Sequence, residues 1–318
     1  MTERNRRTEK RIIVNRKTSG LTIIEILVVV GIIALLTGML IPAVSTVKKT
    51  AKEVKQRAQF TAIDLGLAAF KNDHGDYPPS DPHTWLEDTR EVQNLSGAQK
   101  LAEALLGWDL LGFHPDSGFR ADGYNRWRYD LEGTQHDPGT YFLYDRTSDV
   151  DLEKRGGRYV DLDTANAFRV GRSADHDGLF VDAGNLAPDT FVLCDVFGKG
   201  KDVVLQDGSR EKAGHPILYY RARAHEKLIQ DIYEFPDNYE LLAVKEDADR
   251  TRKGTPPDGD WWNPVVETAG TIHEYLADPR ASTSDLAVPY KPDSYVLISA
   301  GADGRYGTED DICNFKRP

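Results

Sequence analysis

The feature that most constrains this chain is an almost uninterrupted apolar run from Leu21 to Ile41. Its polar members are Thr22, Glu25 and Thr37. As a helix rising about 1.5 Å per residue, the run is about 30 Å long, which matches the hydrocarbon core of a bilayer. The run therefore predicts a single transmembrane helix over residues 21-41.

Charge is distributed unevenly on either side of this run. Residues 1-20 carry two acids, Glu3 and Glu9, and seven basic residues, which are Arg4, Arg6, Arg7, Lys10, Arg11, Arg16 and Lys17. This basic leader has a net charge of +5, and subtracting it from the −11 of the whole chain leaves −16 for the remainder. The leader favours a cytoplasmic N-terminus. No nucleic-acid partner is expected, because nucleic-acid binding depends on neutralising phosphates with Lys and Arg.

The order of Gly20, the apolar run and Glu25 is unusual for a secretory signal. A signal peptide has its small-residue cleavage site after the apolar region, whereas Gly20 precedes it. A carboxylate inside an apolar membrane helix is costly and usually marks a function or a partner. Cleavage after Gly20 would free an α-amino group at Leu21, and a pair between this amine and Glu25 of a neighbouring subunit would satisfy both charges. The alternative is an unpaired Glu25 placed near the membrane interface.

The segment from Gly20 to Glu25, GLTIIE, followed by its apolar stretch, resembles the prepilin cleavage and methylation motif of type IV pilins and type II secretion pseudopilins. The resemblance implies that a prepilin peptidase cuts after Gly20 and methylates the new N-terminus at Leu21. It also implies that Glu25 contacts a neighbour's N-terminus during assembly. Pro42 falls where many members of the family carry a helix-kinking proline.

The first helix is expected to continue past the membrane, over residues 21-72. Apolar residues recur at steps of three and four, as in an amphipathic helix; they are Val44, Val47, Ala51, Val54, Ala58, Ala62, Leu65 and Ala69. Pro42 should bend or loosen this helix. Gly31, Ala34 and Gly38 form a small-residue face, which either suits close helix packing or is merely tolerated.

The remaining residues, 73-318, predict a globular α+β domain. A second helix is expected within 95-113, with Leu101, Leu105, Trp108 and Leu110 or Leu111 facing inward. Short apolar runs separated by Asp-Gly turns predict an antiparallel sheet with long loops; they are 141-144, 191-196, 203-205, 217-221 and 295-299. The expected fold is pilin-like, with the long N-terminal helix packed on this sheet.

The chain has two cysteines, Cys194 and Cys313, without the clustered spacing of a zinc or iron-sulfur site. Two buried free thiols are one interpretation, because free Cys behaves as a small hydrophobic residue. A single disulfide tying the C-terminus to the domain is the other, and it requires an oxidising compartment.

An acidic, glycine-rich segment near the C-terminus, residues 299-311, is either a calcium site or a solvated turn. Its spacing excludes an EF-hand, because Arg305 and Gly307 stand where that loop wants acidic or amide ligands. The segment and the following DICNF resemble the C-terminal calcium loop of the major pseudopilin of type II secretion. The resemblance implies calcium ligands from the carboxylates of Asp303, Asp310 and Asp311 and from carbonyls near Ser299 and Tyr306.

No zinc-protease, P-loop, nucleophile-elbow or dinucleotide motif occurs, and we do not expect an enzyme. The resemblance implies a pseudopilus subunit in protein secretion, single-pass in the bacterial inner membrane, with its domain periplasmic or extracellular. The implied partners are copies of itself, other pseudopilins, the prepilin peptidase, the inner-membrane assembly platform and membrane lipid. The alternatives are a surface type IV pilin for adhesion or motility, and a membrane-tethered hydrolase or binding domain.

Overall fold

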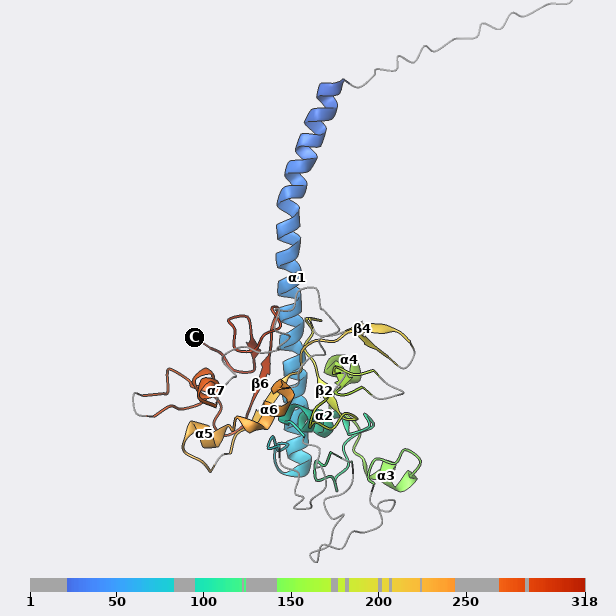
Figure 1. The fold of residues 1–318 in the computed structure, drawn as a ribbon, viewed down its shortest axis with the longest axis vertical. Coiled ribbons are helices and arrows are strands. Elements are labelled where there is room, and N and C mark those ends of the chain that lie inside the picture. The colour runs from blue at the N-terminus through green and yellow to red at the C-terminus, as the bar shows by residue number, and fades with distance from the viewer. Residues whose placement is uncertain are drawn as a thin grey trace, which may run out of the picture. The chain divides into compact units, whose positions relative to one another are not determined.

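The structure is a computed structural model in which two units are distinguished, Met1–Lys49 and Thr50–Pro318. It describes residues 22-82, 95-121, 123, 142-172, 177-180, 183-199, 202-205, 208-223, 225-243, 269-283 and 286-317 (Figure 1). Gly20 and Leu21, the expected cleavage pair, lie outside the described residues.

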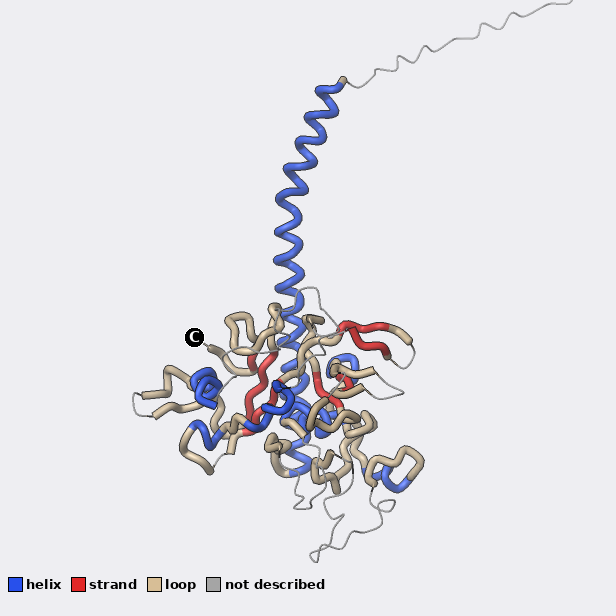
Figure 2. The backbone as a smooth tube through the Cα atoms, in the orientation of Figure 1, coloured by secondary structure: helices blue, strands red, loops and turns tan. Residues whose placement is uncertain are grey.

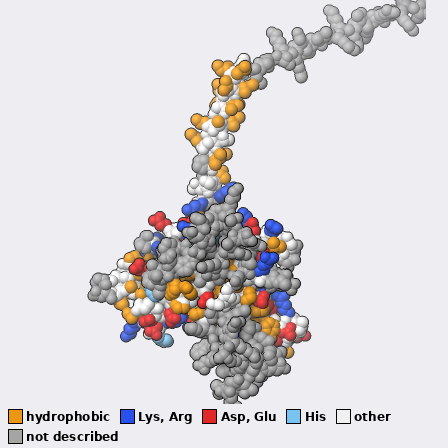
Figure 3. Space-filling model, in the orientation of Figure 1, with side chains coloured by type: hydrophobic (Ala, Val, Ile, Leu, Met, Phe, Trp, Pro, Cys, Tyr) orange, Lys and Arg blue, Asp and Glu red, His pale blue; other side chains and the backbone are white. Residues whose placement is uncertain are grey.

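The long N-terminal helix is present as α1, which spans Ile23–His74 and has 52 residues. It continues through position 42, so the proline there does not end the helix. Between Thr22 and Lys49 every side chain that the structure describes is exposed, and most of them are apolar (Figure 3). By length and composition, α1 is a helix that can cross a membrane.

Within the second unit, α1 packs on the domain through a different face from the expected stripe. Its buried residues are Gln56, Gln59, Phe60, Ile63, Gly66, Leu67 and Phe70. Val54 and Leu65, members of the expected stripe, are 61% and 68% exposed. The expected stripe is not the face that packs on the domain. The helix α1 has two apolar faces, and the face with phenylalanines and longer aliphatic side chains buries more apolar area.

Three small antiparallel sheets make up the β-structure of the described residues (Figure 2). The largest has the order β5-β6-β7, and its strands are Leu218–Arg221, Tyr295–Ser299 and Ile312–Cys313. The other two pair β1 with β2 and β3 with β4, over Ala167–Arg169, Phe191–Leu193, Asp202–Val204 and Arg210–Lys212. The α+β layout is therefore present, although several small sheets replace the single expected one. The segment 141-144 was expected to be a strand, but its described residues, 142-144, form none.

The sheet β5-β6-β7 lies between two apolar layers because alternate side chains of a strand face opposite sides. Tyr219 and Leu297, opposite each other in the register, pack in one cluster with Phe60, Ile63 and Leu67 of α1. Tyr220 and Val296, also opposite each other, pack in the second cluster with residues of α5 (Ile229–Ile232), α6 (Pro236–Ala243) and α7 (Ala269–Leu276). Both faces of this sheet are thus covered.

The second helix, α2, spans Gly97–Leu106 and is buried along its whole length. Ser96 and Gln99 form a capping box at its start, which satisfies backbone donors in the buried first turn. Leu101 and Leu105 face the core as expected, and of the two alternatives Leu110 packs against the same cluster, whereas Leu111 is exposed. The remaining helices are short: α3 Asp149–Lys154, α4 Leu162–Ala165, α5 Ile229–Ile232, α6 Pro236–Ala243 and α7 Ala269–Leu276.

Candidate assembly helix and C-terminal acidic loop

The start of α1 is held by a contact between Thr22 and Glu25. Oε2 of Glu25 accepts hydrogen bonds from the Thr22 amide and from the Thr22 hydroxyl, both at 2.8 Å. The Glu25 amide donates in return to Thr22 Oγ1 at 3.3 Å. This is a capping box, and an acid in the first turn also complements the helix dipole. The Thr-x-x-Glu spacing was the signal in the sequence for this second role of Glu25.

The small-residue face of α1 is open in the first unit. A Cβ added at Gly31 or at Gly38 would meet no atom within 4 Å. The hydroxyl of Thr37, the remaining polar group of the apolar run, donates to the carbonyls of Ile33 and Ala34 at 2.7 and 3.1 Å. Its hydrogen bond is therefore satisfied within the helix, and an apolar neighbour can pack beside it.

In the second unit, polar side chains of α1 bind main-chain groups of the domain. Gln59 Nε2 donates to the carbonyls of Ala165 and Cys194, both at 3.0 Å, and is buried. Gln56 Oε1 accepts from the amide of Val196 at 3.0 Å. These bonds fix α1 to the end of the helix Leu162–Ala165 and to the segment that follows β2. Periodicity of apolar residues gave no indication of them.

The acidic loop brings two of the three expected carboxylates together. Asp310 Oδ2 accepts a hydrogen bond from the Asp303 amide at 2.8 Å, and Asp310 Oδ1 accepts one from the Thr308 hydroxyl at 2.6 Å. Burial raises the pKa of Asp303, and the charge of Asp310 adds to this. Burial acts in the same sense on Asp310, but hydrogen bonds from Thr308 and from backbone amides leave the pKa of Asp310 lowered.

Asp311 has different partners. Its Oδ2 accepts from the hydroxyl of Tyr275, on α7, at 2.5 Å and from the Gly307 amide at 2.6 Å. Its Oδ1 is buried and has no hydrogen-bond partner within the described residues. Burial raises the pKa of Asp311 to about 7.

The side chains of the remaining expected ligands are engaged elsewhere. Ser299 Oγ lies 3.3 Å from Asp195 Oδ2, and the Tyr306 hydroxyl donates to the carbonyl of Pro216. Both side chains are buried. A metal role for these two positions, which stays a prediction, is therefore restricted to their main-chain carbonyls.

The donor chemistry of the loop fits calcium, which takes oxygen ligands and is drawn to clustered carboxylates. Asp303 and Asp310 are in contact although their charges repel, and Asp311 has an unsatisfied buried oxygen. Within the part of the chain that the structure describes, however, no group of three or more acidic, His or Cys side chains has the arrangement of a metal site. Of the three expected carboxylates, Asp303 and Asp310 lie together, whereas Asp311 is held by Tyr275 and Gly307, so a calcium site formed by all three stays a prediction.

A cavity of about 1100 Å³ lies beside this loop, between it and α1. Its walls are Arg57, Phe60, Thr61 and Asp64 of α1 together with Glu309, Asp311 and residues 313-317. Cations and carboxylates are mixed along it. The acidic loop and the part of α1 that belongs to the second unit therefore line one recess.

Both cysteines are buried free thiols. Cys194 follows β2, and burial raises the pKa of its thiol. Cys313 lies in β7 with its Sγ 3.3 Å from the Tyr275 hydroxyl, and burial raises its pKa to about 12. High thiol pKa values make both residues poor nucleophiles.

The chain matches no family model, and no curated protein or solved structure is significantly similar to it.

Proposed function

We propose that this chain is a pilin-like subunit of a filament of the pseudopilus type, cut after Gly20 by a prepilin peptidase and assembled through α1. The observation that carries the proposal is the position of Glu25, the one acid of the apolar run, four residues after Leu21. An acid at that distance from a new N-terminus has a ready partner in the α-amino group of another copy.

The exposed surface of α1 supports assembly through this helix. The apolar side chains from Ile23 to Ile41 are exposed, and so are Val54 and Leu65 on the face that the domain leaves uncovered. In a membrane the first set is solvated by lipid. Outside it, exposed apolar residues in helical register mark a surface that other helices can cover. Packing against copies of α1 would bury both sets in one continuous contact.

The capping box is compatible with an intersubunit role for Glu25. Both hydrogen bonds from Thr22 go to Oε2, which leaves the other oxygen of the carboxylate for an amine. The capping contacts hold the side chain at the first turn of α1, which reduces the entropy lost when the pair forms. Two opposite charges that meet in an apolar setting also fix the axial register between neighbours, because a shifted neighbour leaves both unpaired.

The same proposal places the chain in the bacterial inner membrane, crossing once, with the second unit on the far side from the cytoplasm. Calcium at Asp303, Asp310 and Asp311 would order the loop 299-311 for contacts with the next subunit. A filament subunit of this kind has a mechanical role and no catalytic centre. Its partners would be copies of itself, related subunits, the peptidase and the assembly platform of the membrane.

Charge at position 25 can be separated from helix capping by a matched pair of substitutions. Gln also forms a capping box, so Glu25→Gln keeps the start of α1 but removes the negative charge. We expect Glu25→Gln to insert into the membrane and to be absent from sheared filaments or from filament cross-links. The control Glu53→Gln removes an acid from α1 outside the apolar run and should assemble like the unmodified chain. Normal incorporation of Glu25→Gln would rule out the proposed pair.

A further inference from the structure

A second recess, of about 260 Å³, lies away from α1 and from the acidic loop. Three segments that are far apart in the sequence build it: the residues after α2, those before α3, and the strands β1 and β2 with the turn before β2. Its walls are Trp108, Asp109, Phe142, Tyr144, Arg146, Arg169, Asp189 and Phe191. Nothing in the proposed assembly uses these residues.

Aromatic rings form much of the wall. Trp108 stacks on Tyr144 with ring centroids 6.1 Å apart and meets the edge of Phe142 at 5.8 Å. On the other side, the guanidinium of Arg169 lies 4.9 Å from the ring centre of Phe191. The recess therefore combines flat apolar surfaces with charged groups at their edges.

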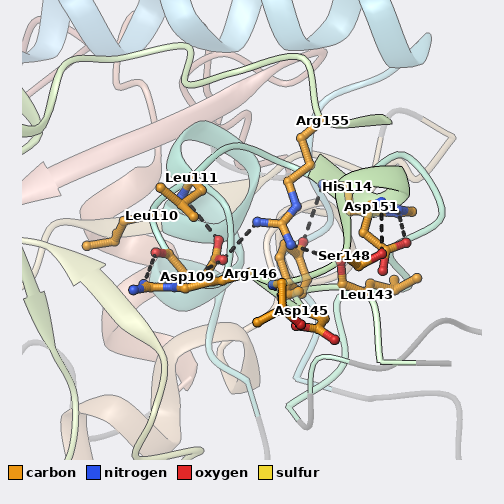
Figure 4. A network of polar contacts seen from close by, with 12 residues as sticks. Asp109, Leu110, Leu111, His114, Leu143, Asp145, Arg146, Ser148, Asp151 and Arg155 are labelled. Atoms are coloured by element: carbon orange, nitrogen blue, oxygen red, sulfur yellow. Dashed lines mark hydrogen bonds and ion pairs between the residues drawn. The ribbon is translucent and has the colours of Figure 1, made fainter. Parts of the chain in front are cut away.

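One of the charged edges is rigid. Asp109 is buried and accepts a hydrogen bond at 2.8 Å from Arg155, whose side chain is 1% exposed (Figure 4). Arg146 reaches the same residue from the solvent side, with its Nη2 donating to the Asp109 carbonyl at 2.8 Å. Asp109 Oδ1 also accepts from the Leu111 amide at 3.1 Å. A group fixed by this many bonds loses little entropy on binding a ligand.

The opposite edge offers a donor and an acceptor side by side. Arg169 Nη1 donates to Asp189 Oδ1 at 3.0 Å and to the Asp189 carbonyl at 2.9 Å. Asp189 is 55% exposed, so its carboxylate is open to solvent. Arg146, whose side chain is 65% exposed, also pairs with the Asp109 carboxylate at 3.5 Å, so the two arginines and the two aspartates of the wall are paired one to one.

We propose that this recess binds one unit of an acidic saccharide, a sugar ring that carries a carboxylate. Its volume of about 260 Å³ lies below the range of about 300–1,000 Å³ typical of sites for drug-sized ligands and suits a single ring. The C–H face of a pyranose packs on aromatic rings such as Trp108. Its hydroxyls can donate to Asp189, and its carboxylate complements the guanidinium groups of Arg146 and Arg169.

Alternative ligand classes fit less well. An aromatic carboxylate would use the rings and the arginines but has no hydroxyl to donate to Asp189. A neutral sugar would use the rings and Asp189 but offers no anion to the exposed guanidinium of Arg146. An acidic sugar can donate from its hydroxyls to Asp189 and can also bind Arg146 and Arg169 through its carboxylate.

The test uses the full chain in detergent micelles and two probes that differ only at C6, glucuronic acid and glucose, measured by titration calorimetry. We expect glucuronic acid to bind with a Kd of about 1 mM and glucose at least about tenfold more weakly. Arg169→Gln should weaken the binding of glucuronic acid by about tenfold or more, the loss expected for one charge-assisted hydrogen bond. Arg280→Gln removes an exposed arginine that is similarly paired with an aspartate, Asp278, and should change nothing.

Each outcome decides a part of the proposal. Absence of heat with both sugars at about 10 mM would overturn it, since weak millimolar binding would be visible there. Equal affinities for the two sugars would overturn the acidic class, and unchanged binding by Arg169→Gln would overturn the location. If Arg169→Gln fails to fold by circular dichroism, Asp189→Asn replaces it. That variant keeps the side-chain shape but loses the acceptor charge, and unchanged binding by it would equally remove the recess as the site.

Discussion

The carboxylate of Glu25 accepts two hydrogen bonds from Thr22, both at 2.8 Å, so the acid of the apolar run also caps the helix that contains it. Two roles thus meet in one side chain: a local one at the first turn of α1 and, in our proposal, one between subunits. The two roles make different demands on Thr22, and this difference can be measured.

Replacing Thr22 by Ala should weaken the start of α1 without removing the charge of Glu25. An N-cap substitution of this kind costs about 0.5–2 kcal/mol of helix stability. We expect Thr22→Ala to insert and to enter filaments at a somewhat reduced level, in contrast to Glu25→Gln. Quantitative blotting of sheared filaments compares the two. An equal defect in both variants would mean that capping, rather than charge, is what assembly requires.

Close packing of α1 on the domain makes Gly66 a sensitive position. A Cβ there would lie 2.8 Å from Val160 Cγ2, 3.0 Å from Leu105 Cδ2 and 3.3 Å from the Tyr159 carbonyl. Gly66→Ala should therefore lower the free energy of unfolding of the second unit by about 1–3 kcal/mol, as overpacking does. Denaturant unfolding in detergent measures this change. Ala69→Ser, at an exposed position one turn later, is the control and should remain within about 0.5 kcal/mol of the parent chain.

The bonds made by Gln59 predict a second stability effect on the same helix. Gln59→Leu conserves most of the volume but leaves the carbonyls of Ala165 and Cys194 without this donor. The Cys194 carbonyl keeps a second donor, Asn166 Nδ2 at 3.0 Å, so the Ala165 carbonyl is the group that loses its partner, and a loss of about 1–3 kcal/mol is expected in the same unfolding experiment. Thr61→Ala, on the exposed side of α1, should have little effect. A Gln59→Leu chain as stable as its parent would show that the Ala165 carbonyl finds another donor.

Asp237 should make stability depend on pH in the acid range. Its carboxylate is buried and accepts hydrogen bonds from Ser80 and from Arg223, the latter at 3.1 Å. Burial raises the pKa of Asp237 to about 6, a change that Arg223 only partly offsets. Between the ordinary Asp pKa of about 3.9 and about 6 the folded state holds the proton more tightly than the unfolded state, so stability falls as pH rises through this window.

Asp237→Asn should remove this contribution. The difference in unfolding free energy between the parent chain and Asp237→Asn is expected to change by about 1.4 kcal/mol per unit of pKa difference, mostly between pH 4 and pH 6. Asp163→Asn, at an exposed position of α4, should leave the pH profile as it is. A constant difference between the parent chain and Asp237→Asn across this range would contradict the raised pKa.

Calcium should stabilise the second unit if the acidic loop binds it. A ligand present at about 100 times its Kd adds about 2.7 kcal/mol to the free energy of unfolding. We expect calcium to raise the Tm of the full chain, chelation to reverse the shift, and Asp310→Asn to abolish most of it. Glu309→Gln, an exposed acid of the same loop, should keep the response. Identical melting curves with calcium and with chelator would rule out calcium binding by this loop.

Much of the fold follows from local patterns in the sequence. The apolar run and its continuation predicted a long first helix, and the run 295-299 coincides with β6. The periods of the apolar pattern that distinguish a helix from a strand involve residues a few positions apart, which the sequence displays. The face of α1 that packs on the domain did not follow, because α1 has apolar residues on two faces. The choice between them is made by area buried against β5 and β6, which are far away in the chain.

The acidic loop illustrates the same limit at the level of a site. Glycines and acids in a short stretch predicted a turn rich in carboxylates, and Asp303 and Asp310 do meet there. The different environment of Asp311 is set by Tyr275, which α7 brings to it from 36 residues earlier in the chain. The spacing of the residues within the loop does not indicate that contact. The capping box at Thr22 and Glu25, in contrast, has a local signal, the Thr-x-x-Glu spacing, which our sequence analysis did not use.

The most direct test of the central claim is the intact mass and N-terminal sequence of the chain extracted from its native membrane. Processing by a prepilin peptidase predicts a chain that begins at Leu21, with a methyl group on its α-amino nitrogen. That result would place the free amine where Glu25 of a neighbour can meet it. A chain that retains Met1, or that begins at any residue other than Leu21, would contradict assembly through a pilin-type N-terminus.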